Sequence, residues 1–260
     1  MTTIQAVSRD RHANKRWKRY SSYQFAAGDA IAALVLQELP KACMALPIAF
    51  VVSGESFIPV SVQGLQAGQN LLVSPEGQWL ARYIPAVYRG YPFALATTED
   101  GQHALCVNED SGLLSEAEGE AFFDEHGEPA QAVKDVLNFL SQVYTNRAAT
   151  ERVCSLLKQH QLIQPWEIKV QSADSEQTLQ GLYRIDEAAF NALPIEALEA
   201  LRQAGTLPVI YCQLLSMQHL PMLGQLAQIR ASQAAPLPQT PAGDLDLEFL
   251  NESGTIKFGG

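Results

Sequence analysis

The chain has 260 residues, of which 47% are hydrophobic and 18% are charged. A chain of this size and apolar content buries a sizeable core without metal ions or disulfides, which excludes disorder of the whole chain. The formal net charge of −10 comes from 28 acidic and 18 basic residues. Because that charge repels nucleic-acid backbones, general binding to nucleic acid is excluded as well.

Cysteine usage and hydropathy favour a soluble cytoplasmic protein. The four cysteines are far apart and lie in apolar surroundings, which is typical of reduced core residues in a cytosol. They are Cys43, Cys106, Cys154 and Cys212. Residues 1–10 lack the apolar stretch of a secretory signal. Charged residues and prolines interrupt the most apolar region, 30–52, so we expect no transmembrane segment.

Residues 1–23, which we call the N-terminal arm, hold six of the 18 basic residues. The basic residues are Arg9, Arg11, Lys15, Arg16, Lys18 and Arg19, and Trp17, Tyr20 and Tyr23 lie among or after them. We expect the arm to lie outside the core, at an edge. It contacts either an acidic partner or the chain's own acidic stretch at 109–128, and the net negative charge favours self-contact over nucleic acid.

The next hundred residues carry the signals of a short helix and an antiparallel sheet. A helix is expected over 38–46, because Pro40 is tolerated only in a first turn and Pro47 ends it. Three pairs of apolar runs flank turn sequences, as in β-hairpins. The pairs are 48–52 with 57–62, 71–73 with 79–82, and 93–96 with 104–107.

After Pro129 the apolar residues recur at helical spacing, and the pattern continues to Leu162. A strand pair is expected at 167–170 and 179–185, followed by helices at about 187–204 and 207–230. These patterns predict an α+β fold, with an N-terminal antiparallel sheet packed against a C-terminal helical layer.

The expected organisation is one domain over residues 1–231, in which 24–110 is mainly β and 111–231 is mainly α. Residues 232–260 form a linker, containing Pro236, Pro238 and Pro241, and a tail.

Several segments, taken in order, resemble the SapC family. They are His12 with Trp17, L-P-I-A-F at 46–50, residues 64–71, G-x-W at 77–79, Y-I-P-A-V-Y-R-G-Y-P-F-A-L at 83–95, F-F-D-E-H-G-E-P at 122–129, and G-L-Y-R-I-D at 181–186. The resemblance covers roughly residues 10–225, and its most specific part is the segment at 83–95. Many members carry a second Arg where this chain has Gly90.

The resemblance implies an intracellular bacterial protein of a family named for an association with surface-layer protein export. Family members tend to be found alongside outer-membrane receptors and flavin-dependent halogenase-like proteins, which implies an accessory role in a surface, export or uptake system. The leading hypothesis is therefore a non-catalytic binding or adaptor protein.

The segment 83–93 is the best candidate binding site, because it combines aromatic rings with arginines that can clamp a carboxylate or phosphate. The candidate residues are Arg82, Tyr83, Tyr88, Arg89, Tyr91 and Phe93. In the alternative interpretation, Pro85 and Pro92 shape a chain reversal whose aromatic rings pack the core. The rival function is an enzyme that acts on a peptide or small carboxylate in this pocket.

Residues 90–133 contain ten acidic residues and no Lys or Arg. Residues 124–128 are compatible with a cation site or with a solvated turn, and we expect neither metal nor cofactor, because the spacing of a calcium loop is missing. Glu109 and Asp110 could serve acid and base chemistry with His103 or His126, but the sequence has no nucleophile or nucleotide-binding motif.

The tail alternates apolar and polar residues, which makes one apolar face on an extended segment. The apolar residues are Leu245, Leu247, Phe249, Ile256 and Phe258. A lone two-stranded hairpin is marginal in water. We therefore expect the tail to add to a sheet edge, either in its own domain or in a partner protein or second copy.

Overall fold

The computed structural model of the chain describes residues 4–97, 102–171 and 176–234. Its largest sheet has five antiparallel strands in the order β10-β13-β4-β5-β3. These strands are β3 (Ile31–Ala33), β4 (Ile48–Ser53), β5 (Ser56–Val62), β10 (Ile163–Pro165) and β13 (Tyr183–Ile185). Strands from both halves of the chain therefore build one sheet.

Three smaller antiparallel sheets complete the β structure in the described residues. One contains β1 (Ile4–Ala6), β7 (His103–Asn108) and β6 (Phe93–Thr97) in that order. The second has β2 (Arg16–Trp17) between β8 (Leu114–Ser115) and β9 (Glu120–Ala121). The third pairs β11 (Ile168–Gln171) with β12 (Glu176–Leu179).

The helices lie mostly in the second half of the chain, so the predicted α+β class is confirmed. The α-helices are α1 (Arg9–His12), α2 (Leu39–Ala42), α3 (Ala86–Arg89), α4 (Gln131–Gln159), α5 (Glu187–Asn191), α6 (Ile195–Gln203), α7 (Leu207–Ser216) and α8 (Leu220–Ala234). Short 3-10 helices are η1 (Gln24–Ala26), η2 (Leu36–Glu38), η3 (Glu109–Ser111) and η4 (Met217–His219).

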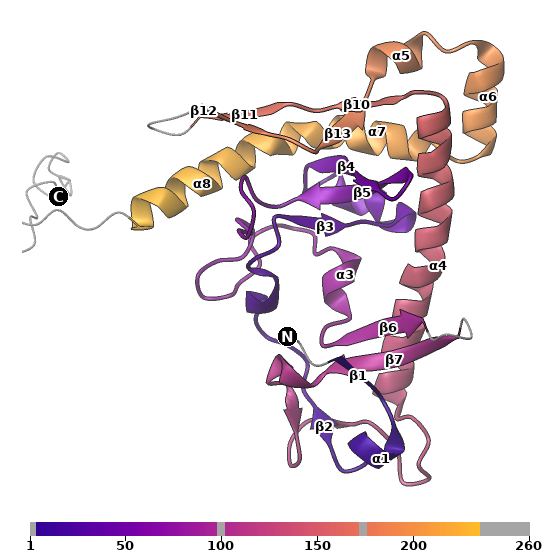
Figure 1. Cartoon of the computed structure of the whole chain (residues 1–260). Helices are drawn as coiled ribbons and strands as arrows, with labels where there is room; N and C mark the ends of the chain where they lie inside the picture. The colour runs from indigo at the N-terminus through magenta and orange to yellow at the C-terminus, as the bar shows by residue number, and fades with distance from the viewer. Residues whose placement is uncertain (1–3, 98–101, 172–175, 235–260) are drawn as a thin grey trace, which may run out of the picture.

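Helix α4 is the element that connects the parts of the molecule (Figure 1). It runs along one side, from the sheet that contains β6 and β7 to the five-stranded sheet. Its first turns pack Val133 and Leu140 against Trp17, Phe93 and Phe122. Its last turns belong to a different cluster, in which Val153, Cys154 and Leu157 pack with strands β4 and β13 and with α7.

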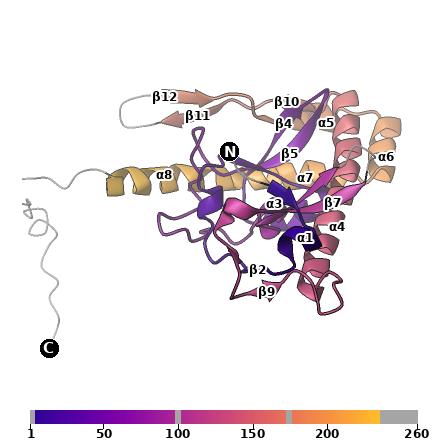
Figure 2. The ribbon, with the colours of Figure 1, turned by 60° about the horizontal axis from the view of Figure 1, so that its bottom comes forward.

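Helix α8 and the β11–β12 hairpin lie side by side and extend away from the rest of the fold (Figure 2). They share a third apolar cluster, in which Leu223 of α8 packs with Ile168 and Leu182 and with buried residues of β5.

Within the described part of the chain, no helix combines the length and the apolar character that a bilayer crossing requires.

The hairpins differ in how closely they follow the expectation. Strands β4 and β5 pair through a tight turn in which Gly54 takes a φ of 57°, and β6 pairs with β7 over five residues. The pair around residues 74–77 is reduced to a single bridge between Val73 and Trp79. Its turn is nevertheless closed, because the Ser74 N–H donates to the carbonyl of Gln78.

The helix expected over 38–46 is shorter and starts earlier. Helical backbone begins at Leu36 as η2, and α2 ends at Ala42, after which residues 43–45 form turns and Leu46 lies in a bend. Pro47 disfavours the α conformation of Leu46, so the helix cannot extend to that residue.

The expectation that the N-terminal arm lies outside the core is wrong for two of its residues. Trp17 is 2% exposed and His12 is 0% exposed. The Trp17 ring packs edge-on against Phe93, with 4.8 Å between ring centroids. Strand β2 is the central strand of its sheet, so both of its edges are paired.

A buried polar network fixes the loop that follows β5. Asn70 is fully buried, and its Nδ2 donates to Gln63 Oε1 at 2.7 Å and to the Ala26 carbonyl at 3.0 Å. Its Oδ1 accepts from the Leu72 N–H at 2.9 Å. The Tyr88 hydroxyl donates to the same Gln63 oxygen at 2.9 Å, which anchors α3 to this loop.

We expect Asn70→Ala to lower the free energy of unfolding by about 3 kcal/mol, because it removes three hydrogen bonds inside the fold and leaves the buried Leu72 N–H without its acceptor. Chemical denaturation monitored by tryptophan fluorescence measures this change. Gln66→Ala is the control, since Gln66 is exposed, and its effect should stay within about 0.5 kcal/mol. Equal effects of the two substitutions would show that the network contributes nothing special.

Candidate functional site

A hollow of about 260 Å³ opens where η2 and α2, the segment 83–89 and the middle of α4 meet. Its lining combines apolar side chains with amides, two cations and one carboxylate. The lining residues are Val35, Gln37, Glu38, Lys41, Tyr83, Ala86, Arg89, Phe139, Gln142, Val143 and Asn146. They come from three parts of the chain that are far apart in sequence.

The Glu38 carboxylate is the buried polar centre of the hollow, with 5% of the side chain exposed. Its Oε1 accepts from the Val35 N–H at 2.9 Å, which is the backward contact of a helix-capping Glu. Its Oε2 accepts from the Ala86 N–H and from the Tyr83 hydroxyl, each at 2.8 Å. Both carboxylate oxygens therefore already have partners inside the fold.

Arg89, the last residue of α3, places its guanidinium at the opening of the hollow. Its carbon Cζ lies 5.2 Å from the ring centroid of Phe139 and 5.7 Å from that of Tyr83, so two aromatic faces hold the cation. Nη2 donates to the Tyr83 hydroxyl at 3.2 Å and lies 3.9 Å from Oε2 of Glu38. The side chain is still 43% exposed, which leaves guanidinium surface open to an incoming acceptor.

Tyr83 is held in its protonated form. Burial and the adjacent Glu38 carboxylate raise the pKa of Tyr83 well above its usual range. The hydroxyl therefore serves as a donor to Glu38 and an acceptor from Arg89, and it does not become a phenolate near neutral pH.

Of the six residues predicted to bind a ligand, Tyr83 and Arg89 line the hollow. The other four, Arg82, Tyr88, Tyr91 and Phe93, lie outside its lining. Arg82 is exposed, Tyr88 is buried against the Asn70 network, and Phe93 packs on Trp17. Tyr91 stacks on Phe25 with 3.8 Å between ring centroids and 6° between planes.

Sequence reasoning missed Glu38 and the four residues that α4 contributes to the hollow. An acidic residue inside the apolar region 30–52 was a usable signal, because a carboxylate in such a setting needs dedicated donors. Nothing in the periodicity of α4 separates Phe139 or Val143 from its other apolar residues.

Gly90 explains how α3 approaches α4 so closely. It is buried, and a Cβ added there would lie 2.6 Å from Cδ2 of Leu140. A second arginine at this position would therefore have to displace the end of the Leu140 side chain. Arg89 acts as a single guanidinium in this chain.

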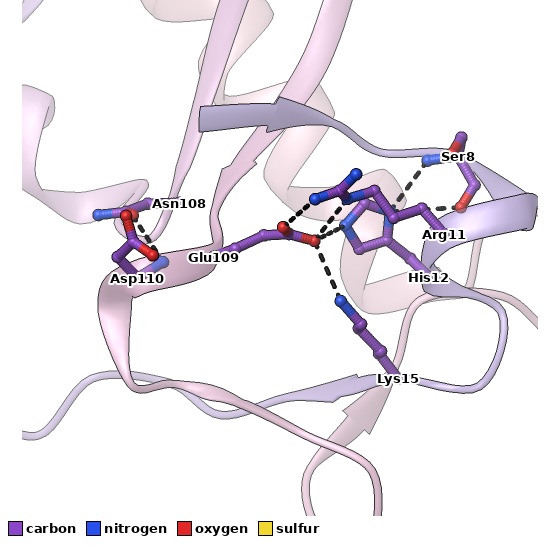
Figure 3. A network of polar contacts seen from close by, with 7 residues as sticks. All are labelled: Ser8, Arg11, His12, Lys15, Asn108, Glu109 and Asp110. Atoms are coloured by element: carbon purple, nitrogen blue, oxygen red, sulfur yellow. Dashed lines mark hydrogen bonds and ion pairs between the residues drawn. The ribbon is translucent and has the colours of Figure 1, made fainter. Parts of the chain in front are cut away.

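Glu109 belongs to the acidic stretch that is a candidate for acid and base chemistry, and Figure 3 shows its contacts. Arg11 binds its carboxylate through two hydrogen bonds of 2.8 and 2.6 Å, and Lys15 adds a third at 3.1 Å. The Arg11 hydrogen bond, reinforced by Lys15, lowers the pKa of Glu109 to about 2. Glu109 thus holds the arm onto η3 as a permanent anion, and such a group is a poor proton carrier near neutral pH.

The self-contact expected of the arm continues beyond Glu109. Lys18 pairs with Glu118 at 2.6 Å, and Arg19 pairs with Glu120 at 2.9 Å.

At the candidate cation site, residues 124–128, Asp124 Oδ1 accepts from the N–H groups of His126 and Glu128, which makes a closed turn. In the described parts of the chain, no three His, Cys, Asp or Glu side chains are grouped so that they could hold a metal ion.

His12 completes the contact between the arm and Glu109. Its Nδ1 lies 3.2 Å from the Ser8 amide nitrogen and 3.3 Å from the Ser8 carbonyl oxygen, and its Nε2 lies 3.3 Å from Oε1 of Glu109. Burial is the largest influence and lowers the pKa of His12, and it outweighs the hydrogen bond with Ser8 and the Glu109 charge, which act in the opposite direction. The fold therefore accommodates the neutral imidazole.

Comparison with known proteins gives one family. The model described as SapC matches residues 7–223. Neither a curated protein nor a solved structure matches the chain.

Acid should weaken the fold through His12. Because the pKa of His12 is lowered on folding, the unfolded chain binds the extra proton first, so stability present above pH 6.5 is lost as the pH falls below it. We expect the melting temperature to fall between pH 7 and pH 5, and to fall less steeply in His12→Gln. His126→Gln, at an exposed histidine, should keep the wild-type slope. An unchanged slope in His12→Gln would contradict the assignment.

Proposed function

The chain belongs to the SapC family, and from this premise we propose that it is a non-catalytic binding or adaptor protein of a bacterial cell-surface, export or uptake system. In this proposal the hollow beside Arg89 recognises an anionic group of its ligand. The protein acts with a partner, such as a receptor or a flavin-dependent halogenase-like protein, which is the setting that the family resemblance implies.

One observation carries the ligand-binding part of the proposal. The guanidinium of Arg89 is held between two aromatic faces at the opening of a hollow, yet 43% of the side chain is exposed. The only acidic side chain among the described residues that line the hollow, Glu38, already accepts three hydrogen bonds of 2.8 to 2.9 Å. A preorganised arginine whose neighbouring carboxylate is engaged elsewhere suits an external anion.

The same geometry favours binding over catalysis. A general base needs a free lone pair and a pKa near the working pH. The Glu38 oxygens are engaged with backbone N–H groups and a hydroxyl, and the pKa of Tyr83 is raised, so this pair is poorly suited to accept a proton.

An enzyme acting on a peptide or a small carboxylate is the second candidate. The observation in its favour is that Glu38 and Tyr83 are titratable groups in hydrogen-bond contact, 2.8 Å apart, at the same hollow as Arg89. Turnover of a bound ligand would distinguish this candidate from the first.

The proposed partner contact uses the tail, which lies outside the described residues. The sequence pattern of Leu245, Leu247, Phe249, Ile256 and Phe258 supports addition of an extended segment to a sheet edge of a partner or of a second copy. The preceding prolines make the linker semi-rigid and extended, at about 3 Å per residue, which gives the tail reach.

We expect Arg89→Ala to lose the molecule retained by the wild-type protein while keeping most of its stability, because the side chain is partly exposed and its removal leaves Glu38 with three donors. The measurement is affinity capture from the native cell, with mass spectrometry of the retained small molecules and proteins and with melting temperatures of each variant.

Arg82→Ala is the matched control, since Arg82 lies on the same segment, exposed and outside the lining of the hollow. The proposal would be contradicted if Arg89→Ala had a much lower melting temperature and yet, at low temperature where it is still folded, retained the same molecules as the wild-type protein. If the wild-type protein chemically converted the retained molecule, the enzyme candidate would replace the binding proposal.

Deletion of residues 236–260 tests the tail separately. We expect the melting temperature of the remaining chain to stay nearly unchanged, while self-association or partner capture becomes weaker. Light scattering and the same capture experiment measure the two effects. If the deletion instead lowers the melting temperature and leaves association as it was, the tail covers apolar surface of its own domain and the adaptor role of this segment is wrong.

A further inference from the structure

The charges around the hollow define which anion would fit. Lys41 and Arg89 are exposed cations of the lining, and Glu38 is its one acidic side chain among the described residues. Counting two positive charges and one negative, the group carries a net charge of +1. Glu38 lies 3.9 Å from Arg89, so its negative charge disfavours a dianion at the guanidinium more strongly than a monoanion.

The size and the walls of the hollow define what the anion is attached to. A volume of about 260 Å³ lies just below the usual range of ligand pockets, which begins at about 300 Å³. Val35, Ala86, Phe139 and Val143 supply apolar walls next to the cations. The space therefore suits one apolar side chain that ends beside an acidic group.

A neighbouring ammonium group would not be tolerated. A free amino acid carries its ammonium close to its carboxylate, and that charge would lie near Arg89. Two exposed cations, Arg89 and Lys41, would repel the ammonium, against one negative charge, that of Glu38. Glu38 is 5% exposed and its oxygens already accept three hydrogen bonds, so it offers the ammonium no direct contact. An acyl or peptide group in place of the ammonium removes this repulsion.

We infer that the hollow binds a monocarboxylate on an apolar group of single-residue size, with an amide in place of a free ammonium. This inference rests on the proposed binding function and names its ligand class. Two sources share this chemistry, namely a free N-acylated amino acid and the C-terminal residue of a peptide. In both, the planar fork of Arg89 would take the carboxylate, and the apolar walls would take the side chain.

Calorimetric titration of the full chain tests the inference with defined probes. The probes are N-acetyl-leucine, acetyl-alanyl-alanyl-leucine, N-acetyl-leucinamide, leucine and phenyl phosphate. We expect one or both of the first two to bind, and the amide and free leucine to bind at least about tenfold more weakly, because each lacks the carboxylate or adds an ammonium. A preference between the first two distinguishes a free acid from a peptide terminus.

Arg89→Gln should reduce binding of the N-acylated probe about tenfold or more, whereas Arg82→Gln should leave it unchanged. The comparison of N-acetyl-leucine with its amide needs no variant, so it stands even if Arg89→Gln is unstable. Equal binding of the acid and the amide would overturn the inference.

Other outcomes separate this inference from the proposed function. Tighter, Arg89-dependent binding of phenyl phosphate or leucine would overturn the ligand class and leave the binding function intact. The same conclusion would follow if no probe bound, but capture from the native cell still yielded a molecule that the Arg89→Ala variant fails to retain. Absence of both would remove the inference and the proposed function together.

Discussion

The hydrogen bonding of one buried carboxylate shapes the central part of this molecule. Glu38 would be costly to bury as an anion, and the fold compensates the cost with one donor from its own turn, Val35, and two from the distant segment 83–86. Meeting that requirement brings the start of α3 against η2, and the middle of α4 lines the same hollow. The hollow is the space that remains beside this junction, and Arg89 reaches it because α3 is held there.

Local signals in the sequence were sufficient for much of the fold. The β4–β5 and β6–β7 pairs follow from apolar runs around short turns, and α4 follows from a repeated helical spacing. The role of Trp17 did not follow, because the basic residues around it dominate the local composition while its burial depends on Phe93 and Phe122. The joining of β10 and β13 to β4 is likewise a pairing between residues far apart in the chain.

The candidate site shows the same division. Tyr83 and Arg89 stood out because aromatic and basic residues are concentrated in their segment. They form a site only together with Glu38, which is 45 residues from Tyr83 in the chain, and with the residues of α4 that line the hollow. The rings of Tyr88 and Tyr91 carry the same local signal, but a hydrogen bond to Gln63 and a stack on Phe25 assign them to the packing of the fold. Composition alone cannot separate rings that pack from rings that line a site.

The hollow lies at the middle of the long helix α4, which connects two apolar clusters. A helix of 29 residues is about 43 Å long, and its two ends belong to different apolar clusters. The hollow contacts its middle, at Phe139, Gln142, Val143 and Asn146. A group seated there would bridge α3 and α2 across the midpoint of a rod that both clusters share. Its binding free energy would therefore add to the packing that holds α2 and α3 against the middle of α4.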